Sequence, residues 1–182
     1  MPHINLGNDM PGIISLFQYR PETAGPLNEL ADFLLHKPNT LEPWERELIA
    51  AHVSGLNDCQ FCTDAHAAFA AAQAPEGLDI DVIRADPGLS PISEKLMALL
   101  AIAGAVQQGG LHVTTELVDK ARAAGAVDLE IHDTVLIAAA FCMINRYVDG
   151  LGTTMPDDPG VFAARAAMMA EARRSEAVSL RP

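Results

Sequence analysis

The stretch from Glu47 to His66, ELIAAHVSGLNDCQFCTDAH, contains the most informative residue pattern of the chain. Cys59 and Cys62 form a Cys-x-x-Cys pair, and His66 follows four residues later. Because residues three or four apart share one face of a helix, these three side chains are expected to line one stripe. Two thiols within bonding reach, with an imidazole beside one of them, indicate thiol–disulfide chemistry.

The composition around this stretch favours an all-α fold. The chain has 182 residues, of which 49% are hydrophobic and only 5% aromatic, and alanine supplies much of the apolar content. Val, Ile and Thr do not gather into the alternating runs that are typical of strands. A chain of this length is expected to form a single domain that buries its own core. We expect one all-helical domain over residues 1–182, with an arm at 1–25, a core at 26–152 and a C-terminal helix and tail at 153–182.

Start and stop signals divide the chain into helices. Residues 1–25 are expected to be extended with about one helical turn, and Pro26 to open the first full helix. Thr40, Asp58, Ser90 with Pro91, Thr114 or Thr115, and Asp128 are the expected starts of later helices. The expected helices are 26–37, 42–54, 59–74, 79–84, 92–106, 115–124, 128–146 and 161–174. The last residues, SEAVSLRP, are expected to fray.

Charge and hydropathy exclude several classes of partner. The net charge of −12 disfavours nucleic acid and anionic membrane, both of which need basic patches. The N-terminal sequence does not have the pattern of a secretory signal. The longest apolar run, Val135–Ile144, is shorter than a membrane span and is interpreted as a buried helix.

Three cysteines, two of them in a close pair, suit redox or metal chemistry in the cytoplasm better than a structural disulfide.

The spacing leaves the roles of the two cysteines open. Cys59 is expected in the first turn of its helix, where the helix dipole stabilises a thiolate. Cys62 is the i−4 neighbour of His66, which can take its proton or pair with its thiolate. Glu47 lies on the preceding helix. A break at 55–58 would let that helix fold back so that the Glu47 carboxylate orients the His66 imidazole.

Other interpretations of these residues remain. The two cysteines could be small buried hydrophobic residues, and Glu47 alone could be a solvated helix residue. A zinc site is a sharper alternative, but it would need His52, Cys142 or a carboxylate as a further ligand. No second Cys-x-x-Cys or His pair is present in the sequence.

The remaining polar residues carry weaker signals. Cys142 lies in an apolar segment and is expected in the core. Asn145 and Arg146 either end a helix at the surface, or form a buried polar contact at the site or at a subunit interface. The other histidines have no partner at informative spacing and are expected at the surface; they are His3, His36, His112 and His132.

Two segments carry a resemblance to a known family. The first is similar to the signature of the alkylhydroperoxidase D-like group of the carboxymuconolactone decarboxylase superfamily; its residues are Glu47, Ser54, Asn57, Cys59, Phe61, Cys62 and His66. The second, FCMINRYVDGLG at 141–152, resembles the branch called uncharacterised peroxidase-related proteins. Together the similarity covers residues 27–152.

The resemblance implies an all-helical bundle that assembles as a homo-oligomer, a trimer or a hexamer. It implies reduction of a small-molecule peroxide by the thiol pair, with a thiol or dithiol reductant and no cofactor or metal. Cys62 would attack the peroxide, Cys59 would be the more accessible resolving thiol, and Glu47 and His66 would relay protons. Alkylhydroperoxidase D has tyrosine where this chain has Phe61, so any role of that hydroxyl is lost. Decarboxylases of the superfamily lack the cysteine pair, which argues against lactone decarboxylation.

Three hypotheses follow from the sequence. The first is a cytoplasmic, cofactor-free thiol peroxidase that acts on alkyl hydroperoxides or hydrogen peroxide. The second is a thiol–disulfide oxidoreductase or redox sensor without significant peroxidase turnover. The third is a metal-binding or structural oligomer with no enzymatic activity.

Overall fold

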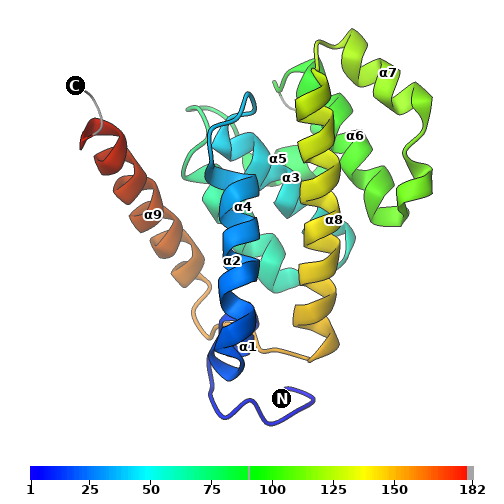
Figure 1. The fold of residues 1–182 in the computed structure, drawn as a ribbon. Helices are drawn as coiled ribbons and strands as arrows, with labels where there is room; N and C mark the ends of the chain where they lie inside the picture. Colours follow the sequence, from blue (N-terminus) through cyan, green and yellow to red (C-terminus); the bar gives the residue numbers. More distant parts are fainter. Residues whose placement is uncertain (90, 180–182) are drawn as a thin grey trace.

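The protein is a helical bundle, as the sequence predicts, and Figure 1 shows its arrangement in a computed structural model. The structure describes residues 1–89 and 91–179, and no β-strand occurs among them. The helices are α1 (Gly12–Tyr19), α2 (Pro21–His36), α3 (Pro43–Leu56), α4 (Gln60–Ala71), α5 (Ile80–Ala85), α6 (Glu94–Gln108), α7 (Thr115–Ala123), α8 (Asp128–Gly150) and α9 (Gly160–Ser179). Short 3-10 turns lie at Pro87–Leu89 (η1) and Gly110–His112 (η2).

The main core lies between α3, α6 and α8. Leucine, isoleucine and alanine side chains from these helices pack together, and Leu48, Ile102 and Ile137 have no exposed surface. The helix α8 has the length and apolar composition of a membrane span, but more than half of its apolar segment is buried inside the bundle. Its burial identifies α8 as a central core helix of this fold, which agrees with the prediction for Val135–Ile144.

A second apolar cluster covers the Cys-x-x-Cys segment. It combines Cys59, Phe61 and Cys62 with Leu6 from the N-terminal segment and Phe162 from α9. In Figure 1, α9 runs along the side of the bundle near α2 and α4, away from α6 and α7. The N-terminal segment is therefore a cover for the cysteine segment and for the end of α8.

The N-terminal region is more helical than the sequence indicated. The expectation of an extended arm through residue 25 is wrong, because α1 forms two turns and α2 begins at Pro21. Pro21 occupies the first helical position that we assigned to Pro26. Pro26 lies inside α2, where its missing N–H removes one backbone hydrogen bond without ending the helix.

Several predicted caps are also wrong, because side chains one to three residues away satisfy the free N–H groups. Glu42, not Thr40, caps α3 through a reciprocal bond pair with Glu45. Ser93 caps α6 by accepting from the Leu96 N–H at 3.1 Å, while the predicted start at Ser90 lies outside the described residues. Asp128, the predicted cap of α8, is instead the first residue of that helix, and Val127 stands at the cap position.

Other boundaries differ less. The predicted cap at Thr114 is confirmed, α6 ends at Gln108, two residues after the predicted end, and Asp79 caps α5. The helix α4 ends at Ala71, before the predicted end at residue 74. The helix α9 continues to Ser179, so the prediction of fraying from residue 175 is wrong through that position, and residues 180–182 lie outside the described residues.

Gly12 holds the N-terminal segment close to the site. It adopts a left-handed backbone with φ of 53°, and a Cβ placed there would lie 2.4 Å from the ring of Phe61. Its N–H also donates to the carbonyl of Thr154 at 2.9 Å, which ties the start of α1 to the segment between α8 and α9.

We expect Gly12→Ala to lower the free energy of unfolding by about 2–4 kcal/mol, measured by urea denaturation. The left-handed backbone and the clash with Phe61 both contribute to this loss. Gly7→Ala is the matched control, because Gly7 has φ of 66° but no atom within 4 Å of the added Cβ. Equal losses in the two variants would show that the contact with Phe61 contributes nothing.

Candidate active site

A tight turn places α4 back against α3. Asp58 takes a left-handed backbone with φ of 59°, a conformation that aspartate tolerates better than most residues. The N–H of Cys59 donates to the Ser54 carbonyl, and the N–H of Asp58 donates to the Gly55 carbonyl. This is a Schellman motif at the end of α3. Asp58 is therefore part of the end of α3, and the prediction that it caps α4 is wrong.

The turn places both cysteines at the start of α4. Cys59 is the N-cap residue, and its carbonyl accepts from the Thr63 N–H at 2.9 Å. Cys62 is the third residue of the helix and so lies in the first turn. The helix dipole therefore favours a thiolate at Cys62, where the sequence had suggested it for Cys59.

Glu47 and His66 meet across the two helices, as the sequence predicted. The Nδ1 atom of His66 lies 2.6 Å from Oε2 of Glu47. The rings of Phe141 and Phe69 contact the imidazole edge to face, with centroids at 4.5 Å and 5.7 Å. These contacts fix the orientation of the ring. Nδ1 binds Glu47, and Nε2 is left to interact with Cys62.

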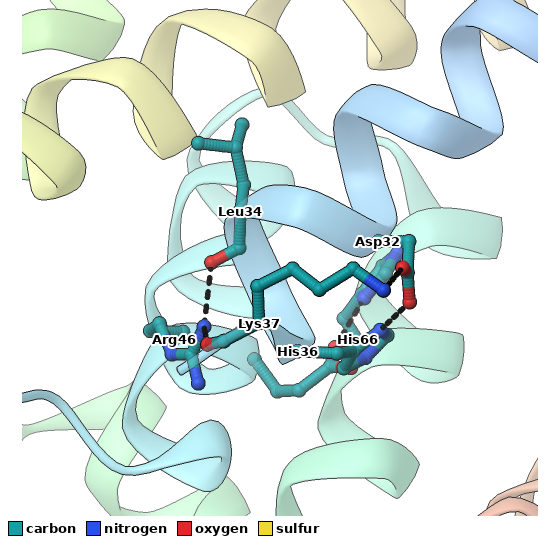
Figure 2. A network of polar contacts seen from close by, with 7 residues as sticks. Asp32, Leu34, His36, Lys37, Arg46 and His66 are labelled. Carbon is teal, nitrogen blue, oxygen red and sulfur yellow. Dashed lines mark hydrogen bonds and ion pairs between the residues drawn. The ribbon is translucent and has the colours of Figure 1, made fainter. Parts of the chain in front are cut away.

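A second histidine binds the other oxygen of Glu47. Nε2 of His36 lies 2.9 Å from Glu47 Oε1, and its Nδ1 lies 3.2 Å from Asp32. Asp32 also pairs with Lys37 at 2.8 Å at the surface. Figure 2 shows Asp32, His36 and His66 gathered in this network. The expectation that His36 is a surface residue without a partner is wrong.

Arg46 explains how His36 reaches Glu47. The buried guanidinium donates through Nη1 to the carbonyls of Leu34 and Lys37, each at 3.0 Å (Figure 2). These are carbonyls at the end of α2, which have no partner within that helix. Arg46 thus fastens the end of α2 onto α3. The sequence shows Asp32 and His36 four residues apart, but it does not show this tertiary contact.

The two histidines keep the buried Glu47 ionised. Burial raises the pKa of Glu47, but the charge of His66 and hydrogen bonds from His36 and His66 lower it to about 2. Burial lowers the pKa of His66, while the charge of Glu47 and its hydrogen bond outweigh that effect and raise it. The pair with Glu47 therefore favours the protonated, imidazolium form of His66.

The two cysteines have opposite electrostatics. A hydrogen bond from the Cys59 thiol lowers the pKa of Cys62, burial opposes that effect, and the charge of His66 and a hydrogen bond from Asn145 add to it. The hydrogen bond to Cys62 and burial both raise the pKa of Cys59, with a smaller contribution from Asp149. The arrangement favours a thiolate at Cys62 with Cys59 as its protonated neighbour.

Asn145 is a buried polar residue of the site, which is the sharper of its two interpretations. Its side chain donates to Ser54 Oγ at 3.0 Å and accepts from Asn57 Nδ2 at 2.9 Å. Asn57 also lies 3.6 Å from the sulfur of Cys142, which is half-buried against the core. Arg146 is exposed and donates to the carbonyl of Cys142 within its own helix. The polar residues of both signature segments therefore connect α3 and α8 behind Cys62.

An apolar cavity of about 330 Å³ opens onto Cys62 and His66. Its walls come from α1, α2, α4, α8 and α9, and Arg165 of α9 supplies a cation. In the single chain both thiols are buried, with Cys59 0% and Cys62 3% exposed, so the greater accessibility expected of Cys59 stays a prediction. Leu6 and Val148 belong to the cluster that encloses Cys59, so only Cys62 faces the cavity.

The remaining candidate ligands lie apart from the site. His132 is exposed and pairs with Asp133, and burial together with the charge of Arg84 lowers the pKa of His52. Among the described residues, no group of three or more His, Cys, Asp and Glu side chains is arranged to hold a metal ion. His52 and Cys142 thus do not complete a zinc site with the cysteine pair there.

Comparison with known proteins gives a family match over part of the chain and a shared fold over most of it. Residues 21–85, which include α2 to α5, match the model of the carboxymuconolactone decarboxylase family. This segment contains Glu47, both cysteines of the pair and His66. A search of curated proteins finds no match.

Solved structures share the fold over most of the chain. An uncharacterised peroxidase-related protein from Ralstonia eutropha JMP134, described as an alkylhydroperoxidase AhpD core, has a TM-score of 0.75 at 24% identity, over 87% of this chain and 82% of its own. A peroxidase-related protein from Silicibacter sp. TM1040 has a TM-score of 0.72 at 21% identity, over 81% and 76%. A protein of unknown function from Agrobacterium tumefaciens, a candidate AhpD antioxidant defence protein, has a TM-score of 0.67 at 24% identity. The match covers 81% of this chain and 99% of that protein. Residues 21–85 are therefore similar to the carboxymuconolactone decarboxylase family, and the chain has the fold of solved alkylhydroperoxidase D-like, peroxidase-related proteins.

Proposed function

We propose that the protein is a thiol peroxidase whose attacking group is the Cys62 thiolate. The observation that supports this most directly is the position of Cys62, which faces an apolar cavity while a Glu47–His66 pair lies beside it. A thiolate that is stabilised in a cavity with a protonated imidazole next to it has both groups needed for peroxide reduction.

The first step reduces the peroxide. The Cys62 thiolate attacks the terminal oxygen of R–O–OH, the O–O bond breaks, and the sulfur becomes a sulfenic acid. The His66 imidazolium donates the proton that the leaving alkoxide needs, so the alcohol R–OH departs. Glu47 stabilises the imidazolium before transfer, and the chain of Glu47, His36 and Asp32 leads to the surface for reprotonation.

The second step resolves the sulfenic acid. The Cys59 sulfur attacks the Cys62 sulfur, a disulfide forms, and hydroxide leaves and is protonated to water. The neighbouring Asp149 is exposed and can pass the thiol proton of Cys59 to solvent. An external thiol or dithiol then reduces the disulfide. The two electrons come from thiols throughout, so the reaction needs no bound cofactor.

A single-turnover experiment tests this function. The reduced protein is mixed with hydrogen peroxide or cumene hydroperoxide in a stopped-flow instrument, and thiols and alcohol product are counted. We expect loss of two thiols per peroxide consumed, and formation of one alcohol for each cumene hydroperoxide. Peroxide consumption no faster than that of free cysteine at the same pH would contradict the proposal.

The paired cysteines also support a second candidate, a thiol–disulfide oxidoreductase or redox sensor. Cys59 and Cys62 are adjacent and hydrogen-bonded, so a reversible disulfide requires little movement. That function would give reversible oxidation by disulfide reagents with negligible peroxide turnover in the same experiment. A metal-binding oligomer is the third, and metal analysis of protein purified without chelator tests it.

We propose that the partner of α8 is a second copy of the chain, in a trimer or hexamer. Exposed positions on α8 follow a heptad pattern; they are Leu129, His132, Leu136, Ala139, Met143 and Arg146. Apolar residues every seven positions along a helix are typical of a seam with another helix. With a net charge of −12, copies of this chain would associate most favourably through such an apolar stripe.

We expect Leu136→Glu to shift the mass measured by light scattering from an oligomer toward the monomer, because it puts a charge in the proposed seam. The matched control is Val82→Glu, since Val82 is a similarly exposed apolar residue on α5, away from the stripe. A wild-type protein that is monomeric at all concentrations, or equal masses in both variants, would contradict the proposed interface.

The net charge of −12 also argues against nucleic-acid and membrane partners. A dithiol that works as a reductant must be kept reduced between turnovers, which supports a cytoplasmic location. The peroxide and the reductant are then small molecules or proteins of that compartment.

A further inference from the structure

The cavity beside Cys62 combines the candidate reactive groups, which form its reactive end, with mostly apolar walls. Cys62, His66 and Glu47 supply the polar groups at the reactive end. The walls are aromatic and aliphatic side chains, among them Phe17, Phe69 and Phe162. Hydrogen peroxide would gain nothing from such walls, whereas an organic hydroperoxide would bury its apolar group against them.

The volume sets the size of that group. A water molecule in the liquid occupies about 30 Å³, so a cavity of about 330 Å³ accommodates roughly ten non-hydrogen atoms. This matches an aryl or medium-chain alkyl group that carries a hydroperoxide. It is small for a long-chain lipid, which would have to extend past α9 into solvent.

Arg165 is an arginine among the residues that line the cavity. It projects from α9, and no carboxylate of the described side chains pairs with it. Its charge is close enough to act on His66, where it opposes the effect of Glu47. Arginine binds carboxylates through two parallel hydrogen bonds, and an arginine at the edge of an apolar cavity is suited to that ligand.

We propose, on the basis of the peroxidase function above, that this cavity selects hydroperoxides of apolar carboxylic acids, with the hydroperoxide at Cys62 and the carboxylate on Arg165. The apolar group between them fills the cavity. The redox step is unchanged, since the carboxylate takes no part in it: the O–O bond breaks, Cys62 becomes a sulfenic acid, and a hydroxy acid leaves. An external dithiol reduces the resulting disulfide.

Two probes that differ in one group test the selection. They are cumene hydroperoxide and its para-carboxy derivative, which have the same reactive group and nearly the same shape. We expect kcat/KM to be higher for the carboxylate. Arg165→Gln should lower the ratio of the two kcat/KM values about tenfold, because one ion pair at the edge of the cavity is lost. Arg165→Lys should restore part of the ratio.

The matched control is Arg20→Gln, which removes an exposed arginine that does not line the cavity. It should leave the ratio unchanged. If Arg165→Gln also leaves the ratio unchanged, or if both variants lower it equally, the assignment of Arg165 is wrong. Such a result would leave the peroxidase function intact, because both probes would still be consumed.

A binding measurement decides the inference even if neither peroxide is consumed. By calorimetry, 4-isopropylbenzoate should bind the reduced protein at least about fivefold more tightly than 4-isopropylbenzamide, and Arg165→Gln should remove that difference. Equal binding of the acid and the amide would overturn the inference. Loss of all peroxide consumption with the preference intact would overturn the proposed reaction and leave the carboxylate site standing.

Discussion

Replacing Cys62 with serine is expected to abolish peroxide reduction, with a loss of at least about a thousandfold in the rate constant of the first step. The reason is that a serine hydroxyl does not ionise in the range where the Cys62 thiol does, although its hydrogen bonds from Cys59 and Asn145 persist. The substitution is nearly isosteric, so the thermal unfolding midpoint should change little. Rapid mixing with cumene hydroperoxide measures the loss.

Cys59→Ser is the informative partner of this variant. The serine hydroxyl can still donate to the Cys62 sulfur, so the thiolate should persist and attack peroxide at a rate within about tenfold of the parent. Without a resolving thiol, the reaction should stop after one peroxide, with one thiol lost and a sulfenic acid that dimedone traps. The steady-state rate of peroxide consumption with added dithiol should fall to a small fraction of the parent rate.

Cys142→Ser controls for the third thiol, which is half-buried and contacts Asn57 outside the cavity. It should resemble the parent in both thiol loss and rate. If Cys59→Ser loses the first step while Cys62→Ser keeps it, the order of the two cysteines is the reverse of the one proposed. If both variants react as fast as the parent, the cysteine pair is not the site of reduction.

The sequence predicted the parts of this protein that depend on local spacing. The Thr114 cap is determined within a few residues, and the structure confirms the helix start that it specifies. The contact between Glu47 and His66 was also predictable. A break at 55–58 lets the second helix fold back on the first, and the two helices then pack side by side with Glu47 facing His66.

Features that depend on distant packing were not predictable. His36 joins the site only because Arg46, ten residues later, fastens the end of α2 onto α3. Cys59 is buried because Leu6 and the end of α8 cover it, and neither is near it in the sequence. The caps at Glu42 and Ser93 show a different limit, since several polar residues near each start could have served and the backbone geometry selected one.

Glu47→Gln is expected to lower the rate of peroxide reduction by about a hundredfold or more, in the range that general acid–base groups contribute. Without the carboxylate, burial lowers the pKa of His66, so the imidazole is neutral near pH 7. The Cys62 thiolate then loses the positive charge beside it, and its pKa should rise. Thiolate absorbance near 240 nm, followed against pH, should therefore show the titration of Cys62 moved upward.

The same substitution should change how stability depends on pH. The pKa of Glu47 is about 2 in the folded protein, below its value of 4.5 in the absence of interactions, so it stabilises the fold above pH 4.5. That contribution, about 3 kcal/mol, is lost as the pH falls from 4.5 toward 2. The pKa of His66 is raised, so its contribution is complete below pH 6.5 and is lost as the pH rises through the folded value. Urea denaturation should show the loss of stability at low pH and the loss at high pH in the parent, and neither loss in Glu47→Gln.

Two further variants separate the charge pair from other effects. His36→Gln keeps the bond between Glu47 and His66 but removes the second histidine, so the rate of peroxide reduction should fall about tenfold. The pKa of Cys62 should rise less in this variant than in Glu47→Gln. Asp64→Asn removes a carboxylate from the same helix as His66 without touching the cavity, and should match the parent. If Glu47→Gln slows the reaction without moving the Cys62 titration, Glu47 acts by holding the helices together and not through the charge of His66.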